Sequence, residues 1–302
     1  MLAVVVTPNP PPMHTAATDP PSSSLSAPLR TLLRSFGQIV LQPNAATGAC
    51  MLGAWLLSEP RLLGAALIGA IAANVSAMLA GSADADLRAG LLGFNGALAG
   101  LTAYSFISDP ARASAVAILA ATATAWLLRP WSGWLRVRGL GYLSSPCLIV
   151  TWLWLPLIAS RSLSARPYAA QPLDAMRFVS GVLAGVAQTG FASGAPAGVL
   201  VLLGIAAASR KHALYALGGA TLASAAQLLL GASVASLDAG LSGFNGALTA
   251  LALADSGYAA MLGGVAMSVL LQAVALHCSW LTMTAPFVLA TWSIQSLRRR
   301  LA

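Results

Sequence analysis

Long apolar runs, each almost free of charged residues, are the feature that most limits how this chain can fold. A membrane-spanning helix needs about 20 mostly apolar residues. Charged residues make up only 8% of the 302-residue chain, against about a quarter in soluble proteins. Each half of the chain contains five such runs, near 36–57, 62–80, 90–107, 111–128 and 140–159, then 178–208, 212–231, 240–254, 258–276 and 279–296. The sequence therefore predicts an all-α polytopic membrane protein.

The two halves share motifs at one fixed spacing. The string GFNGAL occurs at 93–98 and again at 243–248, and the same offset of 150 residues aligns Gln38 with Gln188. Two independent motifs rarely share an offset by chance, so the sequence predicts an internal duplication. If each copy crosses the membrane an odd number of times, the two copies are inverted relative to each other, as in many transport proteins.

A third pair of positions shows where the copies differ in length. The motif prolines, Pro146 and Pro286, are only 140 residues apart. The first half must therefore contain ten additional residues before Pro146, and the basic stretch at 129–139 is the expected insertion.

Composition divides the chain into five segments. Residues 1–33 are rich in Pro and Ser and predict a disordered cytoplasmic tail. They precede a first transmembrane repeat at 34–160 and an external linker at 161–177. A second transmembrane repeat at 178–297 and a basic cytoplasmic end at 298–302 complete the chain.

The basic residues predict an orientation in the membrane. With the amino terminus inside, eleven of them fall in inner loops and five in outer loops. Cytoplasmic loops carry an excess of Lys and Arg, so both termini are predicted to be cytoplasmic, in the plasma membrane or, in a bacterium, the inner membrane. The scattered formal charge of +8 thus indicates topology rather than nucleic-acid binding. The inner set is Arg30, Arg34, Arg88, Arg129, Arg136, Arg138, Arg210, Lys211 and Arg298 to Arg300, and the outer set is Arg61, Arg112, Arg161, Arg166 and Arg177.

The apolar runs contain neutral amides and hydroxyls rather than acids. None of the eight acidic residues lies well inside a run, and intramembrane carboxylates and histidines are the usual means of ion coupling. Gln38 and Gln188 either line a wet path or form structural hydrogen bonds, because burying an unpartnered amide is costly. Because both glutamines recur beside turn-forming residues, we expect them to line a wet path. Asn95 and Asn245 are expected to tie helices together.

An aromatic residue and a leucine stand one helical turn apart in each GFNGAL copy. Phe94 and Leu98 share a helix face, as do Phe244 and Leu248. Without the duplication, this arrangement would indicate only core packing.

The motif prolines lie inside the last apolar run of each half. A proline removes the hydrogen bond to the carbonyl four residues earlier. It therefore either kinks the helix or frees the carbonyls of Tyr142 and Thr282 to accept hydrogen bonds from a solute.

Taken together, the duplicated motifs resemble those of the urea transporter family. They are a glutamine ten residues before a glycine, then GFNG, then a Thr-Ala-Pro-Phe element at 284–287, and the resemblance covers about residues 34–297. It implies two inverted repeats of about five helices each, with half-helices lining a central pore. It also implies a homotrimer with one pore per subunit, urea as the solute, and no enzymatic activity, cofactor or metal.

In this family the solute passes in single file through a narrow slot, its plane between apolar walls and its edge along oxygen atoms. Transferred to this chain, the resemblance implies walls of Phe94, Leu98, Phe191, Phe244 and Leu248, with Leu41 at the counterpart of Phe191, and polar groups from Gln38, Gln188, Ser144 and Thr284.

Four positions depart from the family pattern. Leu41 stands where an aromatic is expected, so the first-half slot is expected to be less aromatic and wider. Ser144 and Cys147 replace Thr and Phe in the first proline motif, although Ser144 keeps the hydroxyl. Gly194 replaces an asparagine that Asn44 retains.

The chemistry of urea agrees with such a slot. Urea is planar and neutral, and it carries four N–H donors against one carbonyl, which suits flat apolar walls edged mainly by acceptors. Guanidinium has a similar shape, but no carboxylate in the runs would offset its desolvation. Several weak sites along a pore allow fast passage, so we expect passive, bidirectional permeation.

Other functions were weighed on the same residues. GLSG at 240–243 matches the Gly-x-Ser-Gly of rhomboid proteases, with His277 two runs later, but the repeat places Leu92 opposite Ser242. Channels for short amides, ammonia or water remain alternatives; residues 43–45 read Pro-Asn-Ala, unlike the Asn-Pro-Ala of aquaporins. Proton-driven symport is disfavoured by the absence of acids inside the runs.

Overall fold

The computed structural model describes residues 26–82, 84–158 and 172–301, and within them the chain is helical without strands. The first half forms α1 (Ser26–Gln38), α2 (Ala45–Ser58), α3 (Pro60–Leu79), α4 (Asp84–Arg88), α5 (Phe94–Phe106), α6 (Pro110–Val137) and α7 (Ser145–Ile158). The second half forms α8 (Ala175–Gln188), α9 (Ala195–Ala208), α10 (Arg210–Leu229), α11 (Val234–Asp238), α12 (Phe244–Leu253), α13 (Tyr258–His277) and α14 (Ala285–Leu301). The prediction of an all-helical protein is confirmed.

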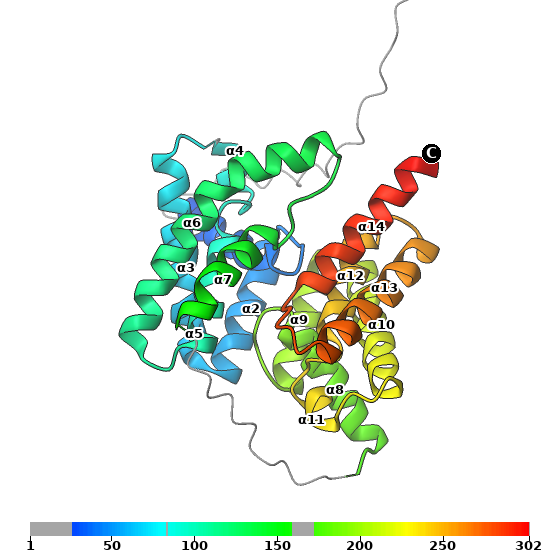
Figure 1. The fold of residues 1–302 in the computed structure, drawn as a ribbon. Helices are drawn as coiled ribbons and strands as arrows, with labels where there is room; N and C mark the ends of the chain where they lie inside the picture. Colours follow the sequence, from blue (N-terminus) through cyan, green and yellow to red (C-terminus); the bar gives the residue numbers. More distant parts are fainter. Residues whose placement is uncertain (1–25, 83, 159–171, 302) are drawn as a thin grey trace, which may run out of the picture.

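The helices form two bodies that lie side by side, one built from α1 to α7 and the other from α8 to α14 (Figure 1). Helix lengths recur in the same order: α2 and α9 have 14 residues each, α3 and α10 have 20, and α4 and α11 have 5. The equivalent helices α2 and α9 pack against each other between the two bodies. The second half therefore follows the first element by element.

Two of the predicted runs are not single helices. Run 36–57 is divided between α1 and α2, and run 178–208 between α8 and α9. At the first break, Asn44 Oδ1 accepts hydrogen bonds from Ala46 N at 2.8 Å and Thr47 N at 3.3 Å and so caps α2. At the second break Gly194 has φ +83° and no side chain to cap α9. The departure at residue 194 thus changes how the helix begins.

Segment boundaries also differ from the sequence expectation. Helix α1 begins at Ser26, so residues 26–33, assigned to the disordered tail, are helical, whereas residues 1–25 lie outside the described part. Most of the predicted linker 161–177 also lies outside it, and α8 already begins at Ala175.

The basic stretch at 129–139 continues a helix. Helix α6 has 28 residues, whereas its counterpart α13 has 20. Figure 1 shows α6 changing direction in its second half, as expected from Pro130 inside the helix. The insertion therefore extends and redirects α6 rather than forming a loop.

Three helices are long and apolar enough to cross a membrane: α3, α6 and α13. Five shorter apolar helices accompany them in the described residues: α2, most of α7, α8, α9 and α12. This mixture of long and short apolar helices agrees with a polytopic membrane protein. The ten continuous runs of the sequence overstate the number of full-length spans, because turns divide two of them and several others form short helices.

Glycines of the repeated motifs allow the helices to cross closely. A Cβ on Gly96 would overlap the carbonyl oxygen of Gly69, and a Cβ on Gly246 would overlap that of Gly219. Helices α3 and α5, like α10 and α12, therefore touch backbone to backbone, as small residues permit in membrane proteins.

The glycine ten residues after each repeated glutamine also lets two helices approach closely. A Cβ on Gly48 would overlap the carbonyl of Leu33, and one on Gly198 would overlap the carbonyl of Leu183. These contacts hold α1 against α2 and α8 against α9, on either side of the loops that follow the glutamines.

Candidate functional site

Equivalent loops follow Gln38 and Gln188, the last residues of α1 and α8. Three residues further on, Leu41 has φ +59° and Phe191 has φ +63°. The left-handed region costs a non-glycine residue on the order of 1–3 kcal/mol and persists only where the surroundings impose it. The same strained conformation in both halves holds the half-buried Leu41 and Phe191 side chains in equivalent positions.

The amide of Gln38 offers an acceptor. Its Oε1 is buried and has no hydrogen-bond partner among the described residues. Leaving a buried carbonyl oxygen without a partner costs about 1–3 kcal/mol. Gln38 Oε1 is thus an unsatisfied acceptor within the described structure.

The predicted wall residues lie in the first turns of α5 and α12. Phe94 is 3% exposed, Leu98 5% and Leu248 2%, while Phe244 is half-buried. The Phe94 ring stacks on Tyr142, with centroids 5.8 Å apart and 25° between the ring planes. These side chains are apolar and closely packed against their neighbours.

The structure brings wall residues from different halves together. Leu248 belongs to an apolar cluster with Phe287 and Val288, and Leu41 and Phe244 pack against its edge. Leu41 thus packs against an apolar cluster built mainly from the other half. Phe191 packs at the edge of the main core cluster that contains Phe94 and Leu98.

Two hydroxyls meet at the contact between the halves. Ser144 Oγ and Thr284 Oγ1 lie 2.8 Å apart, directly before α7 and α14. Ser144 is buried and Thr284 half-buried. The two residues that the resemblance implies for the central polar site therefore form one hydrogen-bonded pair.

Asn95 ties α5 to the beginning of α7. Its Nδ2 donates to the Leu143 carbonyl and its Oδ1 accepts from Cys147 N, both at 3.1 Å. Cys147 N is among the first N–H groups of α7, which have no partner inside the helix. Both the nitrogen and the oxygen of the amide thus take part in this contact.

Asn245 makes the equivalent contacts in the second half. Its Nδ2 donates to the Met283 carbonyl at 3.1 Å and to Gln272 Oε1 at 3.0 Å, and its Oδ1 accepts from Phe287 N at 3.3 Å. The prediction that both asparagines tie helices together is confirmed.

The prediction about the motif prolines is wrong in both halves. Both prolines stand second in their helices, α7 and α14, where a missing N–H costs little because it would have no partner in the helix. The Tyr142 carbonyl accepts from both Ser145 N and Ser145 Oγ. The Thr282 carbonyl accepts from Ala285 N at 2.9 Å. These carbonyls close turns instead of being released by a break inside a helix.

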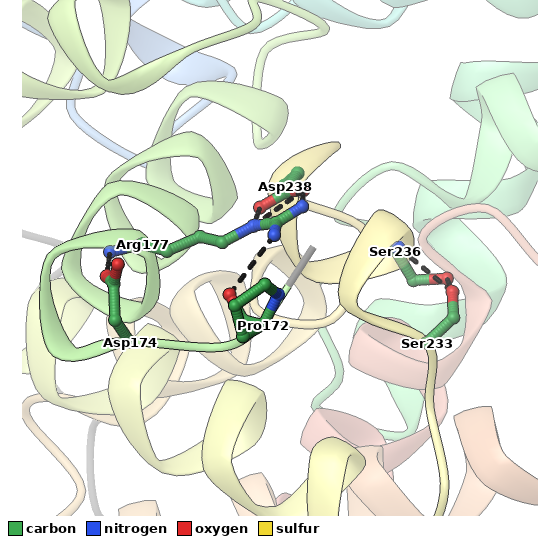
Figure 2. A network of polar contacts seen from close by, with 6 residues as sticks. All are labelled: Pro172, Asp174, Arg177, Ser233, Ser236 and Asp238. Atoms are coloured by element: carbon green, nitrogen blue, oxygen red, sulfur yellow. Dashed lines mark hydrogen bonds and ion pairs between the residues drawn. The ribbon is translucent and has the colours of Figure 1, made fainter. Parts of the chain in front are cut away.

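The pairing of Arg177 with Asp238 was not expected from the sequence. Arg177 Nη2 lies 2.6 Å from Asp238 Oδ2, and Asp174 Oδ1 accepts from Arg177 N at 2.7 Å (Figure 2). The pair borders a cleft of about 440 Å³ that also reaches Gly194, in the loop after Gln188. The sequence could not predict this ion pair, because its two residues are 61 positions apart.

A second set of polar contacts, besides the Ser144–Thr284 pair, joins the two halves. Gln42 Nε2 and His212 Nδ1 lie 2.8 Å apart, and His212 Nε2 lies 3.3 Å from Asp255 Oδ2. Lys211 Nζ bonds Asp255 Oδ1 at 2.8 Å, which lowers the pKa of that carboxyl group. Gln42 directly follows Leu41, so this network anchors the first loop to α10.

The geometry gives no support to a serine protease. Ser242 is buried, with no hydrogen-bond partner for its Oγ among the described residues, and His277 is exposed at the end of α13. His277, expected inside an apolar run, therefore lies at a helix end.

Comparison with known protein families finds a match that covers nearly the whole chain. One family model, described as urea transporter, matches residues 29–299. No curated protein matches the chain.

Proposed function

Because this chain belongs to the urea transporter family, whose members are transporters and not enzymes, we propose that urea crosses the membrane passively through a slot within each chain. Its walls are the side chains already placed on α5, α12 and the loops after α1 and α8. The residues in this proposal are Phe94, Leu98, Phe244 and Leu248 with Leu41 and Phe191 as walls, and Gln38, Gln188, Ser144 and Thr284 as polar contacts.

The observation that carries the slot is the partnerless acceptor on Gln38. Its Oε1 is buried, and Leu41, in the loop after it, packs with Phe244 against the apolar cluster that contains Leu248. Urea presents N–H donors around its edge and two apolar faces, so one molecule can satisfy the oxygen while its faces contact the walls. The Ser144 and Thr284 hydroxyls offer a second polar station. Stations of moderate affinity favour rapid passage.

A neutral cargo follows from where the charges lie. Asp174, Asp238 and Asp255 stand at helix ends, and each has an ion pair or caps a helix. None of them is part of the proposed slot. A cation entering it would lose hydration without gaining a counter-charge, which is costly in an apolar passage. The Arg177–Asp238 pair at the cleft beside Gly194 carries no net charge, so it would not exclude a neutral solute.

We propose that the two halves are inverted repeats and that both termini are cytoplasmic. The matched helix lengths and the paired positive φ angles at Leu41 and Phe191 support the duplication. Helices α6 and α14 end on one side of the molecule, where Arg299 bonds the Arg138 carbonyl, and α8 begins near α11 on the opposite side (Figure 1). The excess of basic residues on the first side supports a cytoplasmic orientation.

We further propose a homotrimer in a plasma membrane, an inner membrane in a bacterium. Both halves of the slot come from one chain, because Ser144 and Thr284 meet within it. Each subunit of an oligomer would then have its own pathway. Cross-linking of the protein in membranes tests the trimer, and a largest product of any other size contradicts it.

Replacing Gln38 tests the slot. Gln38→Ala removes the acceptor, and urea permeability per protein in proteoliposomes is expected to fall about tenfold, since 1.4 kcal/mol corresponds to that factor. Gln295→Ala is the matched control, because Gln295 Oε1 is also buried without a partner but lies outside the proposed slot, on α14. Equal losses in the two variants would contradict the proposal.

A second candidate cargo is a short amide such as acetamide. It is favoured by Leu41, which leaves the first loop without the aromatic ring that Phe191 provides in the second. A methyl group on the solute would then find room at one end of the slot. The ratio of acetamide to urea permeability measures this directly.

A further inference from the structure

The end of α6 and the end of α14 together carry a group of arginines. Arg129 and Arg136 lie on the extension of α6, Arg138 follows it, and Arg298–Arg300 form the last turn of α14. The counterpart of the extension after α13 reads Cys278, Ser279 and Trp280, without a basic residue. The function proposed above does not use these arginines.

The backbone around Arg138 is shaped to receive Arg299. Arg299 Nη1 donates to the Arg138 carbonyl at 2.8 Å. Gly139 has φ +61°, and a Cβ at this residue would overlap the Arg299 guanidinium. Only glycine both adopts this conformation readily and leaves the space. The positive φ and the missing Cβ of Gly139 thus leave room for the Arg299 guanidinium beside the Arg138 carbonyl.

Tryptophan rings hold the guanidinium of Arg138. The Arg138 guanidinium lies 3.6 Å from the centroid of the Trp134 ring, and its Nη1 donates to the Trp134 carbonyl at 2.9 Å. Trp134 stacks on Trp131, with centroids 5.1 Å apart, and Trp131 Nε1 donates to Ser145 Oγ at 2.8 Å. The ring stack thus holds Arg138 in place relative to the start of α7.

Capping of helix ends explains only part of this arrangement. Arginines near a helix C-terminus commonly bond the last carbonyls. Each guanidinium has five N–H donors, and among the described residues Arg138 and Arg299 each give one of them to a carbonyl. Both side chains are exposed. The two guanidinium groups thus bond two carbonyls four residues apart, those of Trp134 and Arg138, and most of their donors remain available for an anion with several oxygens.

The surroundings indicate a lipid rather than a soluble anion. Trp126 is 68% exposed, Trp134 48% and Val137 87%, all on the same stretch of α6. Exposed tryptophans beside arginines at the ends of spanning helices are typical of the depth of lipid headgroups. We propose that Arg138 and Arg299 bind the headgroup of an anionic phospholipid, with Trp126, Trp134 and Val137 against its glycerol and upper acyl chain.

Arg136 is left outside this site. Arg136 is exposed two residues before Arg138, and among the described residues its side chain makes no hydrogen bond to the carbonyls of Trp134 or Arg138. The headgroup contacts are therefore assigned to Arg138 and Arg299 alone.

Lipid binding by the purified full-length protein tests the proposal. The probes are dioctanoyl phosphatidylglycerol, dioctanoyl phosphatidylcholine and inorganic phosphate, each titrated while thermal unfolding and lipid retention in native mass spectrometry are recorded. We expect phosphatidylglycerol to bind most tightly. Arginines near a membrane surface contribute about fivefold each, so the double variant Arg138→Gln/Arg299→Gln is expected to bind it on the order of tenfold to thirtyfold more weakly.

The matched control removes the same charge from the opposite end. Arg61→Gln/Arg112→Gln changes residues at the starts of α3 and α6 and is expected to keep the preference for phosphatidylglycerol. Arg138→Lys/Arg299→Lys keeps the charge without the planar fork and is expected to bind at an intermediate level. Equal binding of both lipids, equal stabilisation by inorganic phosphate, or the same loss in the control variant would each overturn the proposal.

Discussion

Ser144 Oγ lies 2.8 Å from Thr284 Oγ1, although 140 residues separate them in the chain. Each hydroxyl precedes a short helix, and each helix is tied by an asparagine of the GFNG motif. The duplicated motifs thus act together: the glycines allow close crossing, the asparagines hold the helix ends, and the hydroxyls meet between the halves.

Removal of one hydroxyl should slow urea without unfolding the protein. Thr284→Val keeps the shape of the side chain but leaves Ser144 without its partner, at a cost of about 1 kcal/mol. We expect urea permeability to fall about fivefold, since 1.4 kcal/mol corresponds to tenfold. Thr284→Ser retains the hydroxyl and should stay near wild type in the same stopped-flow assay. A Thr284→Val protein with unchanged flux would exclude this polar station.

The residue at position 41 should set discrimination by size. Leu41→Phe adds a ring where Phe191 already provides one in the other half, and the ratio of acetamide to urea permeability is expected to fall. Phe191→Leu should raise that ratio. Both residues already have positive φ, so neither exchange imposes a new backbone strain. Ratios that stay constant in both variants would show that these loops do not contact the solute.

Motif glycines should be intolerant of a single methyl group. Gly96→Ala would force α3 and α5 apart and destabilise the fold by about 1–3 kcal/mol. Gly64→Ala is the control on α3, because nothing lies within 4 Å of a Cβ there. It should leave the midpoint of thermal unfolding unchanged or raise it slightly, since alanine favours helix. Equal midpoints for the two variants would contradict the close crossing.

Transport should be independent of the proton gradient. The proposed slot contains amides, hydroxyls and apolar side chains, none of which titrates in the physiological range. A protonophore added to proteoliposomes is expected to leave the initial rate of urea entry unchanged. Loss of uptake on collapse of the gradient would require a titrating group in the pathway.

The sequence indicated where the loops occur but not their conformation. Pro43 and Asn44 predict a break in an apolar run, and Asn44 caps α2. The left-handed conformation at Leu41 could not be predicted, because a leucine adopts it only under tertiary constraint. The duplication indicated which residues form the candidate site, whereas the distances between them depend on the tertiary structure.

Other features were missed because local pattern and tertiary context disagree. Pro146 was expected within a run, yet it begins α7, where its missing N–H is harmless. The network of Gln42, His212 and Asp255 has no repeat counterpart, and Gln42 and His212 are 170 residues apart. Without a repeated pattern, such a pairing leaves no sign in a single sequence.

Solute selectivity of the wild-type protein tests the central claim most directly. Stopped-flow light scattering on proteoliposomes compares urea with glycerol, a neutral solute of similar polarity that is neither planar nor an N–H donor. The flat slot with its acceptor on Gln38 predicts rapid urea entry, far above that of protein-free liposomes, with glycerol close to the protein-free rate. Glycerol entry as fast as urea entry would contradict it.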